Sequence, residues 1–226
     1  TVACNTIAMI AGGNTVVFNA HPAGKEAAAK AVDLLNRAVI EAGGPANLAT
    51  MPRIPNTETL QEIMDSPMVS LLIGTGGEGM VKLLMASKKK VIAAGPGNPP
   101  TIVDETADVK RAAATLYQNV PVENNMLCIT EKEAFVVEQV YDEFMAEMRR
   151  LGARVLTPEE VEKVVAASLH QEENGKYVAN KNMVGRDANV VLADAGVKPS
   201  EGDLRLAIIE ADPGNPFVCC EQMLPI

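Results

Sequence analysis

The sequence predicts an α/β protein in which parallel strands alternate with helices. Short apolar runs typical of buried strands alternate with stretches of helical spacing along the chain. A glycine-rich turn lies between one such strand and the helix that follows it. Of the 226 residues, 47% are hydrophobic and 22% are charged, which is typical of folded globular proteins. The length allows one large domain or two small ones, each with a core of its own.

The first 95 residues show the alternation clearly. A short apolar run predicts a first strand, and the helix after it carries apolar residues at helical spacing until Gly43 and Gly44 stop it. The predicted elements are a strand at 15–19, a helix containing Ala28, Val32, Leu35 and Val39, a helix at 58–64, a strand at 69–73, a helix at 78–86 and a strand at 90–94.

The amino-acid composition changes at GPGNPP, which is poor in helix formers and indicates a domain boundary near residue 95. We therefore expect one domain at 1–95 and a second at 96–226. The sequence from Thr157 to Glu160 predicts a helix that begins with a capping box. The other expected elements are a strand at 101–103, a helix at 107–119, a strand at 134–137, a helix with Val137, Tyr141, Phe144, Met148 and Leu151 on one face, and strands at 189–192 and 204–210.

Charge and composition exclude several classes of partner. The 20 basic and 29 acidic residues give a net charge of -9, which repels nucleic acids and anionic membranes. No apolar run approaches the roughly 18 residues of a membrane span, and the opening TVACNTIAMIAGG lacks the basic leader of a signal peptide. We therefore expect a soluble, cytoplasmic protein. The chain begins without Met and stops at an apolar stretch, so we expect it to be a piece of a longer protein.

Cysteine and histidine usage argues against metal sites and disulfide frameworks. The four cysteines show no CxxC spacing, and Cys219 and Cys220 are adjacent, so neither a zinc site nor a disulfide scaffold is expected. The two histidines leave little material for a His-rich metal site or a Ser-His-Asp triad. We predict no metal.

The glycine-rich turn is a candidate cofactor site. Gly74, Thr75, Gly76, Gly77 and Gly79 fit GxGxxG between a strand and a helix, where a phosphate or cofactor approaches backbone N–H groups. A dinucleotide fold places an acidic residue at the end of the next strand, but that strand ends in Ala-Ala-Gly. A tight turn that packs the helix against the strand would explain the same glycines, so both interpretations stay open.

Cys128 is a candidate nucleophile, although a cysteine between Leu and Ile is more often an inert core residue. His21 follows the first strand at the sheet edge where cofactors bind, but a loop role satisfied by backbone is as good an explanation. His170 is interpreted as a solvated helix end. The acidic pairs at 159–160 and 172–173 are interpreted as solvated helix faces.

Four segments carry a resemblance to a known family. SLLIGTGGEGM, KKVIAAGPGNPPTIVDETAD, NNMLCITEKEAFVVEQVYDEF and PFVCCEQMLPI, in this order, resemble the aldehyde dehydrogenase superfamily. They are most similar to the CoA-acylating aldehyde dehydrogenases of propanediol and ethanolamine utilisation. The resemblance covers essentially the whole chain and roughly half of the family's length. It implies a parallel-sheet, Rossmann-like NAD-binding domain at 1–95 and an α/β catalytic cysteine domain at 96–226, both incomplete.

The resemblance also implies roles for particular residues. Cys128 matches the family's nucleophilic cysteine, and residues 74–79 match the turn beside the nicotinamide end of the cofactor. Asn19 and His21 match positions that hold the adenosine ribose. Glu221 matches a glutamate that steadies the nicotinamide ribose.

Two departures from the family pattern bear on the reaction. Hydrolytic members carry a glutamate base in the segment equivalent to IAAGPG, where this chain has Ala93. Water needs such a base, whereas the more acidic thiol of CoA needs less help, so the departure favours acyl transfer to CoA. The family's oxyanion-binding asparagine lies upstream of the segment matched by Thr1. Within this chain, the backbone N–H of Cys128 is therefore the expected oxyanion donor.

The expected function is NAD-dependent oxidation of acetaldehyde or propionaldehyde to its acyl-CoA through a cysteine thioester. The cofactors implied are NAD and coenzyme A; NAD is expected over NADP because no arginine stands near Asn19 or His21 to take a 2′-phosphate. Alternatives are a non-catalytic cofactor-binding or assembly fragment, a hydrolytic aldehyde dehydrogenase and a related reductase that uses an acyl phosphate. The resemblance also suggests a homo-oligomer and leaves enclosure in a bacterial microcompartment shell open.

Overall fold

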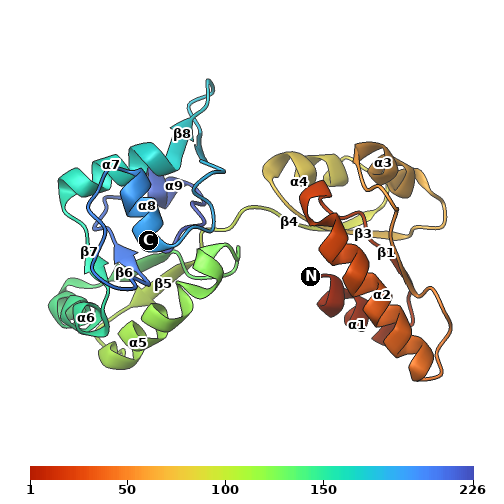
Figure 1. The fold of residues 1–226 in the computed structure, drawn as a ribbon, viewed down its shortest axis with the longest axis horizontal. Helices are drawn as coiled ribbons and strands as arrows, with labels where there is room; N and C mark the ends of the chain where they lie inside the picture. Colours follow the sequence, from red (N-terminus) through yellow and green to blue (C-terminus); the bar gives the residue numbers. More distant parts are fainter. The chain divides into compact units, whose positions relative to one another are not determined.

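The computed structural model describes residues 1–226. The chain forms two compact units, Thr1–Gly95 and Pro96–Ile226. Gly95 and Pro96 belong to the GPGNPP segment, which contains no helix (Figure 1).

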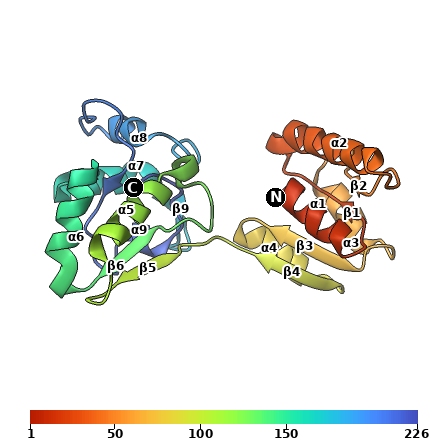
Figure 2. The ribbon, with the colours of Figure 1, turned by 90° about the horizontal axis from the view of Figure 1, so that it is seen from below.

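The first unit alternates helices with short parallel strands, as the sequence predicts. Two parallel pairs form, β1 with β2 and β3 with β4. Figure 2 shows β3 and β4 side by side with α4 packed against them. The elements are α1 (Val2–Ala11), β1 (Val16–Val17), η1 (Pro22–Gly24), α2 (Lys25–Glu41), β2 (Ala49–Thr50), α3 (Thr57–Asp65), β3 (Leu71–Thr75), α4 (Glu78–Met85) and β4 (Lys90–Ala94).

The β3–β4 pair is held by a small apolar cluster. Leu60 and Met64 from α3, Leu72 from β3 and Leu84 from α4 are its buried members. Leu60 and Met64 are four residues apart and therefore lie on one face of α3. Burying each such side chain contributes about 1.5 to 3 kcal/mol. The cluster thus fixes the turn that joins β3 to α4.

The second unit contains two parallel pairs, β5 with β6 and β7 with β10, and one antiparallel hairpin, β8 with β9. Its elements are β5 (Pro100–Val103), α5 (Val109–Asn119), η2 (Val122–Asn125), β6 (Glu133–Val136), α6 (Glu138–Leu151), β7 (Arg154–Val155), α7 (Pro158–Ser168), β8 (Leu169–Gln171), β9 (Tyr177–Ala179), α8 (Ala188–Asp194), β10 (Ala207–Ile208) and α9 (Pro216–Cys219).

Two apolar clusters make the core of this unit. In the first, α5 and α6 pack against each other and the β5–β6 pair; its buried residues include Val103, Leu116, Phe144 and Met148. Phe144 and Met148 share the α6 face that the sequence predicts to be apolar. In the second, α7 and α8 pack together around Val164 and other fully buried side chains. These clusters hold the loops at the ends of β5 and β6.

The capping box predicted at the start of α7 is confirmed. The Thr157 side chain accepts a hydrogen bond from the Glu160 N–H at 3.3 Å, and the Glu160 carboxylate accepts one from the Thr157 N–H at 3.0 Å. Glu160 also pairs with Arg154 at 2.6 Å. The carboxylate is therefore partly covered by structural contacts and is not a free acid or base.

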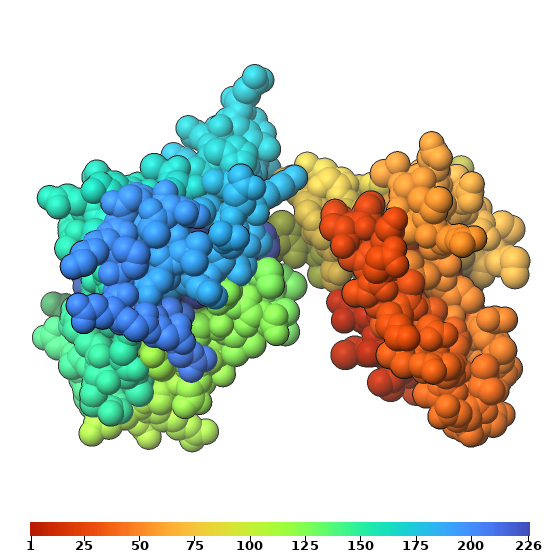
Figure 3. Space-filling view, in the orientation of Figure 1, coloured from red at the N-terminus to blue at the C-terminus, as the bar shows by residue number.

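Three predictions about the later part of the chain are wrong. Residues 189–192, predicted as a strand, lie within α8, where Ala188, Val191 and Leu192 are buried at helical spacing. Of the strand predicted at 204–210, only Ala207–Ile208 pairs with a neighbour. His170, predicted at a helix end, lies in strand β8. The β8–β9 hairpin projects from the surface of its unit (Figure 3). None of the helices is both long and apolar enough to cross a lipid bilayer.

Candidate active site

Cys128 lies in the loop that leads from α5 into β6. The thiol is exposed, so the interpretation as an inert core residue is wrong. The loop crosses the carboxyl end of α5 and returns to pair β6 with β5, since the Lys132 N–H donates to the carbonyl of Pro99 at 3.0 Å. A nucleophile on such a loop is held by the strands beneath it and remains open to a reactant.

The loop turns sharply because three consecutive residues adopt left-handed backbone angles. Glu123, Asn124 and Asn125 have φ values of 52°, 51° and 60°. Asparagine tolerates this conformation better than most residues, and two of the three are asparagine. Asn125 is fully buried, and its Nδ2 donates to the carbonyls of Val120 and Glu131, each at 3.0 Å. Its side chain therefore joins the two ends of the loop.

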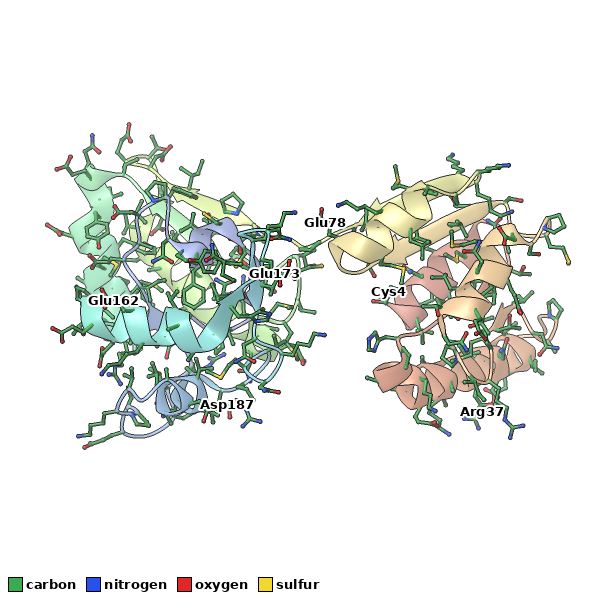
Figure 4. All side chains as sticks on the ribbon, turned by 90° about the horizontal axis from the view of Figure 1, so that it is seen from above. Cys4, Arg37, Glu78, Glu162, Glu173 and Asp187 are labelled. Carbon is green, nitrogen blue, oxygen red and sulfur yellow. The ribbon has the colours of Figure 1, made fainter.

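The loop is anchored on its other side by the turn at the start of α8. The Asn124 Nδ2 donates to the carbonyl of Gly185 at 3.0 Å and to the Asp187 carboxylate at 2.9 Å. Gly185 has a φ of 70°, and a Cβ there would collide with Met126. Asp187, labelled in Figure 4, thus belongs to the support of the cysteine loop.

A second segment, residues 96–99, lies directly against Cys128. A Cβ on Gly97 would collide with the carbonyl oxygen of Cys128. The Gly97 N–H donates to the Glu221 Oε1 at 3.2 Å. Three segments far apart in the sequence therefore meet at one place: the loop of Cys128, the turn of Gly97 and the segment of Glu221.

The next residue, Asn98, ties this turn to α9 and β6. Its Nδ2 donates to the carbonyls of Phe217 and Val218 at 3.2 and 3.1 Å and to the Glu133 carboxylate. Burial raises the pKa of Glu133, and the hydrogen bond from Asn98 opposes that shift. Asn98 thereby keeps Gly97 within hydrogen-bonding distance of Glu221.

Lys132 is a site residue that the sequence analysis missed. The residue is only 9% exposed, and its Nζ donates to the carbonyls of Asn125 and Leu127 and to the Asn125 side chain. Burial lowers the pKa of Lys132, while the negative charges of Glu221 and of the Cys128 thiolate raise it. No sequence signal distinguishes this lysine from a surface lysine, because its burial comes from the fold of the loop around it.

The other cysteines are placed differently. Cys220 is half-buried, and burial, together with the charges of Cys219 and Glu221, raises the pKa of its thiol. The neutral thiol is a poor nucleophile. Cys219 and Cys4 are exposed, but neither adjoins a loop built like that of Cys128.

A cavity of about 370 Å³ lies elsewhere in the second unit. Its walls are mainly apolar and include Phe135, Phe144 and Phe217, and Cys128 is not among its lining residues. Lys132 and Glu133 border it. The exposed thiol therefore lies outside this hollow.

The glycine-rich turn lies in the first unit, at the carboxyl end of β3. A Cβ on Gly74 would collide with Leu84, so this glycine permits close packing of α4 on the strand. A Cβ on Gly76 would press on Met80 at 3.3 Å, whereas one on Gly77 or Gly79 would meet nothing within 4 Å. Packing thus accounts for the first two glycines and leaves the other two with open space around them.

Asn19 and His21 follow β1, at the carboxyl end of that strand. The Asn19 amide donates to the carbonyl of Asn56 at 3.0 Å and accepts from the Thr59 hydroxyl at 2.8 Å, so it also fixes the start of α3. The exposed His21 accepts a hydrogen bond at Nδ1 from the Ala23 N–H at 3.2 Å. In the neutral ring this leaves the Nε2–H as a donor toward solvent or a ligand.

The predicted site residues thus fall into two sets. Cys128 and Glu221 meet in the second unit, with Gly97 between them. Asn19, His21 and the glycine-rich turn (Gly74, Thr75, Gly76, Gly77 and Gly79) lie at carboxyl ends of strands in the first unit. No group of three or more His, Cys, Asp and Glu side chains is placed to hold a metal ion.

Comparison with known proteins gives consistent matches. The model of the aldehyde dehydrogenase family matches residues 1–202. The acetylating acetaldehyde dehydrogenase EutE of Escherichia coli is 40% identical over all of this chain and 49% of its own length.

Solved structures give the same result. A propionaldehyde dehydrogenase from the Clostridium phytofermentans fucose utilisation bacterial microcompartment superposes with a TM-score of 0.90 at 38% identity, over 100% of this chain and 51% of that one. A Rhodopseudomonas palustris propionaldehyde dehydrogenase with bound CoA and an acylated cysteine gives 0.89 at 31% identity, over 100% of this chain and 50% of that one. The chain spans about half the length of the relatives it matches.

Proposed function

Because this chain belongs to the aldehyde dehydrogenase family, we propose that the protein containing it oxidises a short aliphatic aldehyde to its acyl-CoA, with Cys128 as nucleophile. The observation that carries the proposal is the loop of Cys128. It presents an exposed thiol on a backbone that is braced by a buried asparagine and a buried lysine. The similarity to an enzyme with bound CoA and an acylated cysteine supports the same assignment.

The first step is addition of the Cys128 thiolate to the aldehyde. The sulfur electron pair forms a C–S bond, and the carbonyl electron pair moves to oxygen, which gives a thiohemiacetal anion. The N–H of Cys128 has no acceptor within the chain and is free to donate to this oxygen. Such a donor contributes mainly in the transition state, where the charge develops.

Collapse of this anion expels a hydride from the former aldehyde carbon and leaves a thioester on Cys128. NAD, when bound, supplies the acceptor for the hydride. In the first unit, Gly77 and Gly79 have open space around them for a cofactor. In the second unit, one oxygen of Glu221 accepts from the Gly97 N–H and the other is available for a further hydrogen bond. Asn19 and His21 are proposed to contact the adenosine ribose.

Glu78 favours the nicotinamide end of the cofactor over its phosphates at the glycine-rich turn. It lies in the first turn of α4 and pairs with Lys82 at 2.6 Å. A carboxylate beside the amino end of the helix would repel a pyrophosphate. A nicotinamide ring, which is positive when oxidised, does not suffer this repulsion.

The last step is transfer of the acyl group to CoA. The CoA thiolate adds to the thioester carbon, and the Cys128 thiolate leaves, so the enzyme is restored with no net proton change beyond ionisation of the CoA thiol. The segment IAAGPG has Ala93 and no carboxylate to activate water. This composition favours CoA over water as the acceptor.

A second candidate function is a cofactor-binding or assembly fragment without catalysis. The observation that favours it is that Asn19, His21 and the glycine-rich turn lie together in one compact unit, Thr1–Gly95, which does not contain Cys128. A 23.9 kDa species that binds NAD and turns over no aldehyde would support it. Activity of a longer protein that carries the chain would support the acylating function.

The surroundings of the enzyme are also proposed by similarity. A relative comes from a bacterial microcompartment, and we extend this location to the protein that contains this chain. A homo-oligomer is the proposed assembly. Co-sedimentation with shell proteins and measurement of the mass in solution test these two statements.

The requirement for CoA is the main test of the reaction. The purified full-length protein is expected to reduce NAD when aldehyde and CoA are both present. Without CoA, the rate should fall at least about tenfold, because the thioester is then released only by slow hydrolysis with water that no base activates. The measurement is NADH absorbance, with acyl-CoA identified by mass spectrometry. Equal steady rates with and without CoA would instead indicate a hydrolytic enzyme. NADP in place of NAD tests the choice of cofactor.

Gly79→Ala tests the glycine-rich turn. The added methyl group meets no protein atom, and alanine is a better helix former, so the free energy of unfolding should rise by about 0.5 kcal/mol. If the open space receives the cofactor, the dissociation constant for NADH should rise by about tenfold, which is a loss of about 1.4 kcal/mol. Chemical unfolding and NADH fluorescence titration measure the two effects. Unchanged NADH affinity would contradict a cofactor at this position.

Gly74→Ala is the matched comparison for Gly79→Ala. Its methyl group would collide with Leu84, so it should destabilise the unit by about 1 to 3 kcal/mol through overpacking. Opposite signs for the two stability changes would show that the first glycine serves packing and that the second is not required for the fold.

A further inference from the structure

The ammonium group of Lys132 donates all of its hydrogen bonds to oxygens of Asn125 and Leu127, just before the nucleophile. Its Nζ donates to the carbonyl of Asn125 at 2.9 Å and to that of Leu127 at 3.4 Å, and it also contacts the Asn125 side-chain oxygen. None of the salt bridges in the chain includes this lysine. Carbonyl and amide oxygens, instead of a carboxylate at ion-pair distance, therefore solvate the buried ammonium group.

Burying an ammonium group is less favourable than burying a neutral side chain of similar size. Removing a charge from water costs several kcal/mol even after the protein relaxes around it, and neutral side chains fill such positions without that cost. The three oxygens offset part of the cost, but all three belong to one short turn. The contacts of Lys132 therefore constrain the conformation of this one turn.

The geometry of the peptide bond relates the direction of the Leu127 carbonyl to that of the Cys128 N–H. The Leu127 carbonyl and the Cys128 N–H belong to the same peptide unit, which is planar and trans, so they point in opposite directions. Lys132 draws the carbonyl inward, and the Thr130 N–H donates to the same oxygen at 3.1 Å. The N–H of Cys128 must then point away from the lysine, and it has no acceptor in the chain.

The left-handed residues explain why the turn needs this support. Each of Glu123, Asn124 and Asn125 adopts a conformation that is less favourable for residues other than glycine, and the last of them lies two residues before Leu127. Without Lys132, the Leu127 carbonyl would keep only the hydrogen bond from the Thr130 N–H, and the Leu127–Cys128 peptide would be held less firmly. The direction of the oxyanion donor would then be less well fixed.

We propose that Lys132 is a positioning residue that orients the Leu127–Cys128 peptide so that the Cys128 N–H donates to the oxyanion formed during acyl chemistry at this thiol. The inference rests on the proposed function, since it concerns the same nucleophile. It adds a residue whose role is exerted through the backbone of its neighbour. Lys132 itself does not touch the substrate in this proposal.

Two reagents separate this role from a general effect on the thiol. An activated ester such as p-nitrophenyl acetate acylates a thiolate through an oxyanion, whereas iodoacetamide alkylates it by direct displacement at carbon without one. Both reactions need the thiolate, so the ratio of their rates at Cys128 cancels any change in thiolate population. Site-resolved mass spectrometry measures both rates, and the exposed Cys4 on α1, labelled in Figure 4, is the control within the same molecule.

In the full-length protein, Lys132→Met should lower the ratio of acylation to alkylation at Cys128 by at least about tenfold, because a lost oxyanion donor typically costs a hundredfold or more. The rates at Cys4 should not change. Lys132→Arg, which keeps a cationic donor, should keep most of the wild-type ratio. Lys163→Met on the exposed surface of α7 is the matched control and should change nothing.

An unchanged ratio in Lys132→Met would overturn the proposal, as would an equal fall in both rates. If Lys132→Met does not fold, Lys132→Ala, which also lacks a donor and is small enough to admit water to the site, is measured in its place by the same criterion. The ratio requires neither NAD nor an aldehyde. A protein that oxidises no aldehyde and still shows the predicted ratio would refute the proposed function and leave the role of Lys132 standing.

Discussion

Cys128→Ala is expected to abolish aldehyde oxidation by the full-length protein. Without the sulfur, neither the thiohemiacetal nor the thioester forms, and removal of a covalent nucleophile typically lowers kcat by at least about a thousandfold. The measurement is CoA-dependent NADH formation at saturating aldehyde. Binding of NADH should stay close to that of the wild type, because Cys128 is exposed and the substitution removes one surface sulfur atom.

Substitution of the other cysteines is the control for this experiment. Cys4→Ala and Cys219→Ala remove exposed thiols in the two units and should each leave kcat within about twofold of wild type, as expected for surface changes. A Cys128→Ala protein that retains CoA-dependent activity would show that the nucleophile is another residue. Cys220 would then be the next thiol to test, although burial raises its pKa.

Periodicity predicted the elements in which one face alone is buried. The apolar face of α6 and the capping box of α7 were identified from the sequence and are present. Helix α8 was mistaken for a strand because its apolar residues are consecutive in NVVL and include two valines, which favour strands. The distinguishing signal was the burial of Ala188, Val191 and Leu192, and this depends on the packing of α7 against α8.

The candidate site was only partly accessible from the sequence. Cys128 was identified by its resemblance to a family, since its neighbours alone favoured a core residue. The Asn-Asn pair at 124–125 was a usable signal for left-handed backbone, because asparagine tolerates that conformation. The burial of Lys132 had no such signal. It arises when the loop closes over the lysine between α5 and β6, which is a tertiary event.

The segment GPGNPP shows why a composition change was an incomplete guide. Its glycines and prolines indicated a boundary between domains, and the two compact units do divide at Gly95 and Pro96. The same segment also contacts the nucleophile loop through Gly97 and α9 through Asn98. A single stretch of sequence therefore ends one unit and forms part of the site in the other.

Gly97→Ala is expected to produce the second largest effect. The methyl group would collide with the Cys128 carbonyl oxygen, which is backbone and cannot rotate away as a side chain can. Either the 96–99 segment or the cysteine loop must move. A displacement of about 1 Å at a reacting group can lower the rate about a hundredfold, and we expect a fall of this size in kcat.

The same substitution should weaken a second feature of the site. The Gly97 N–H is a donor to Glu221, so movement of the turn also releases the glutamate proposed to hold the nicotinamide ribose. We therefore expect the KM for NAD to rise together with the fall in kcat, and the free energy of unfolding to drop by about 1 to 3 kcal/mol through overpacking. Steady-state kinetics and thermal unfolding measure the three quantities.

Gly214→Ala provides the matched control for Gly97→Ala. It lies in the same unit, and its added methyl group would meet no atom within 4 Å. Because alanine restricts the unfolded chain, this variant should be slightly more stable than wild type, by about 0.4 to 1 kcal/mol, and fully active. Wild-type kinetics in Gly97→Ala would contradict the close approach of the turn to Cys128. A loss of stability with unchanged kcat would show that the contact supports the fold without positioning the nucleophile.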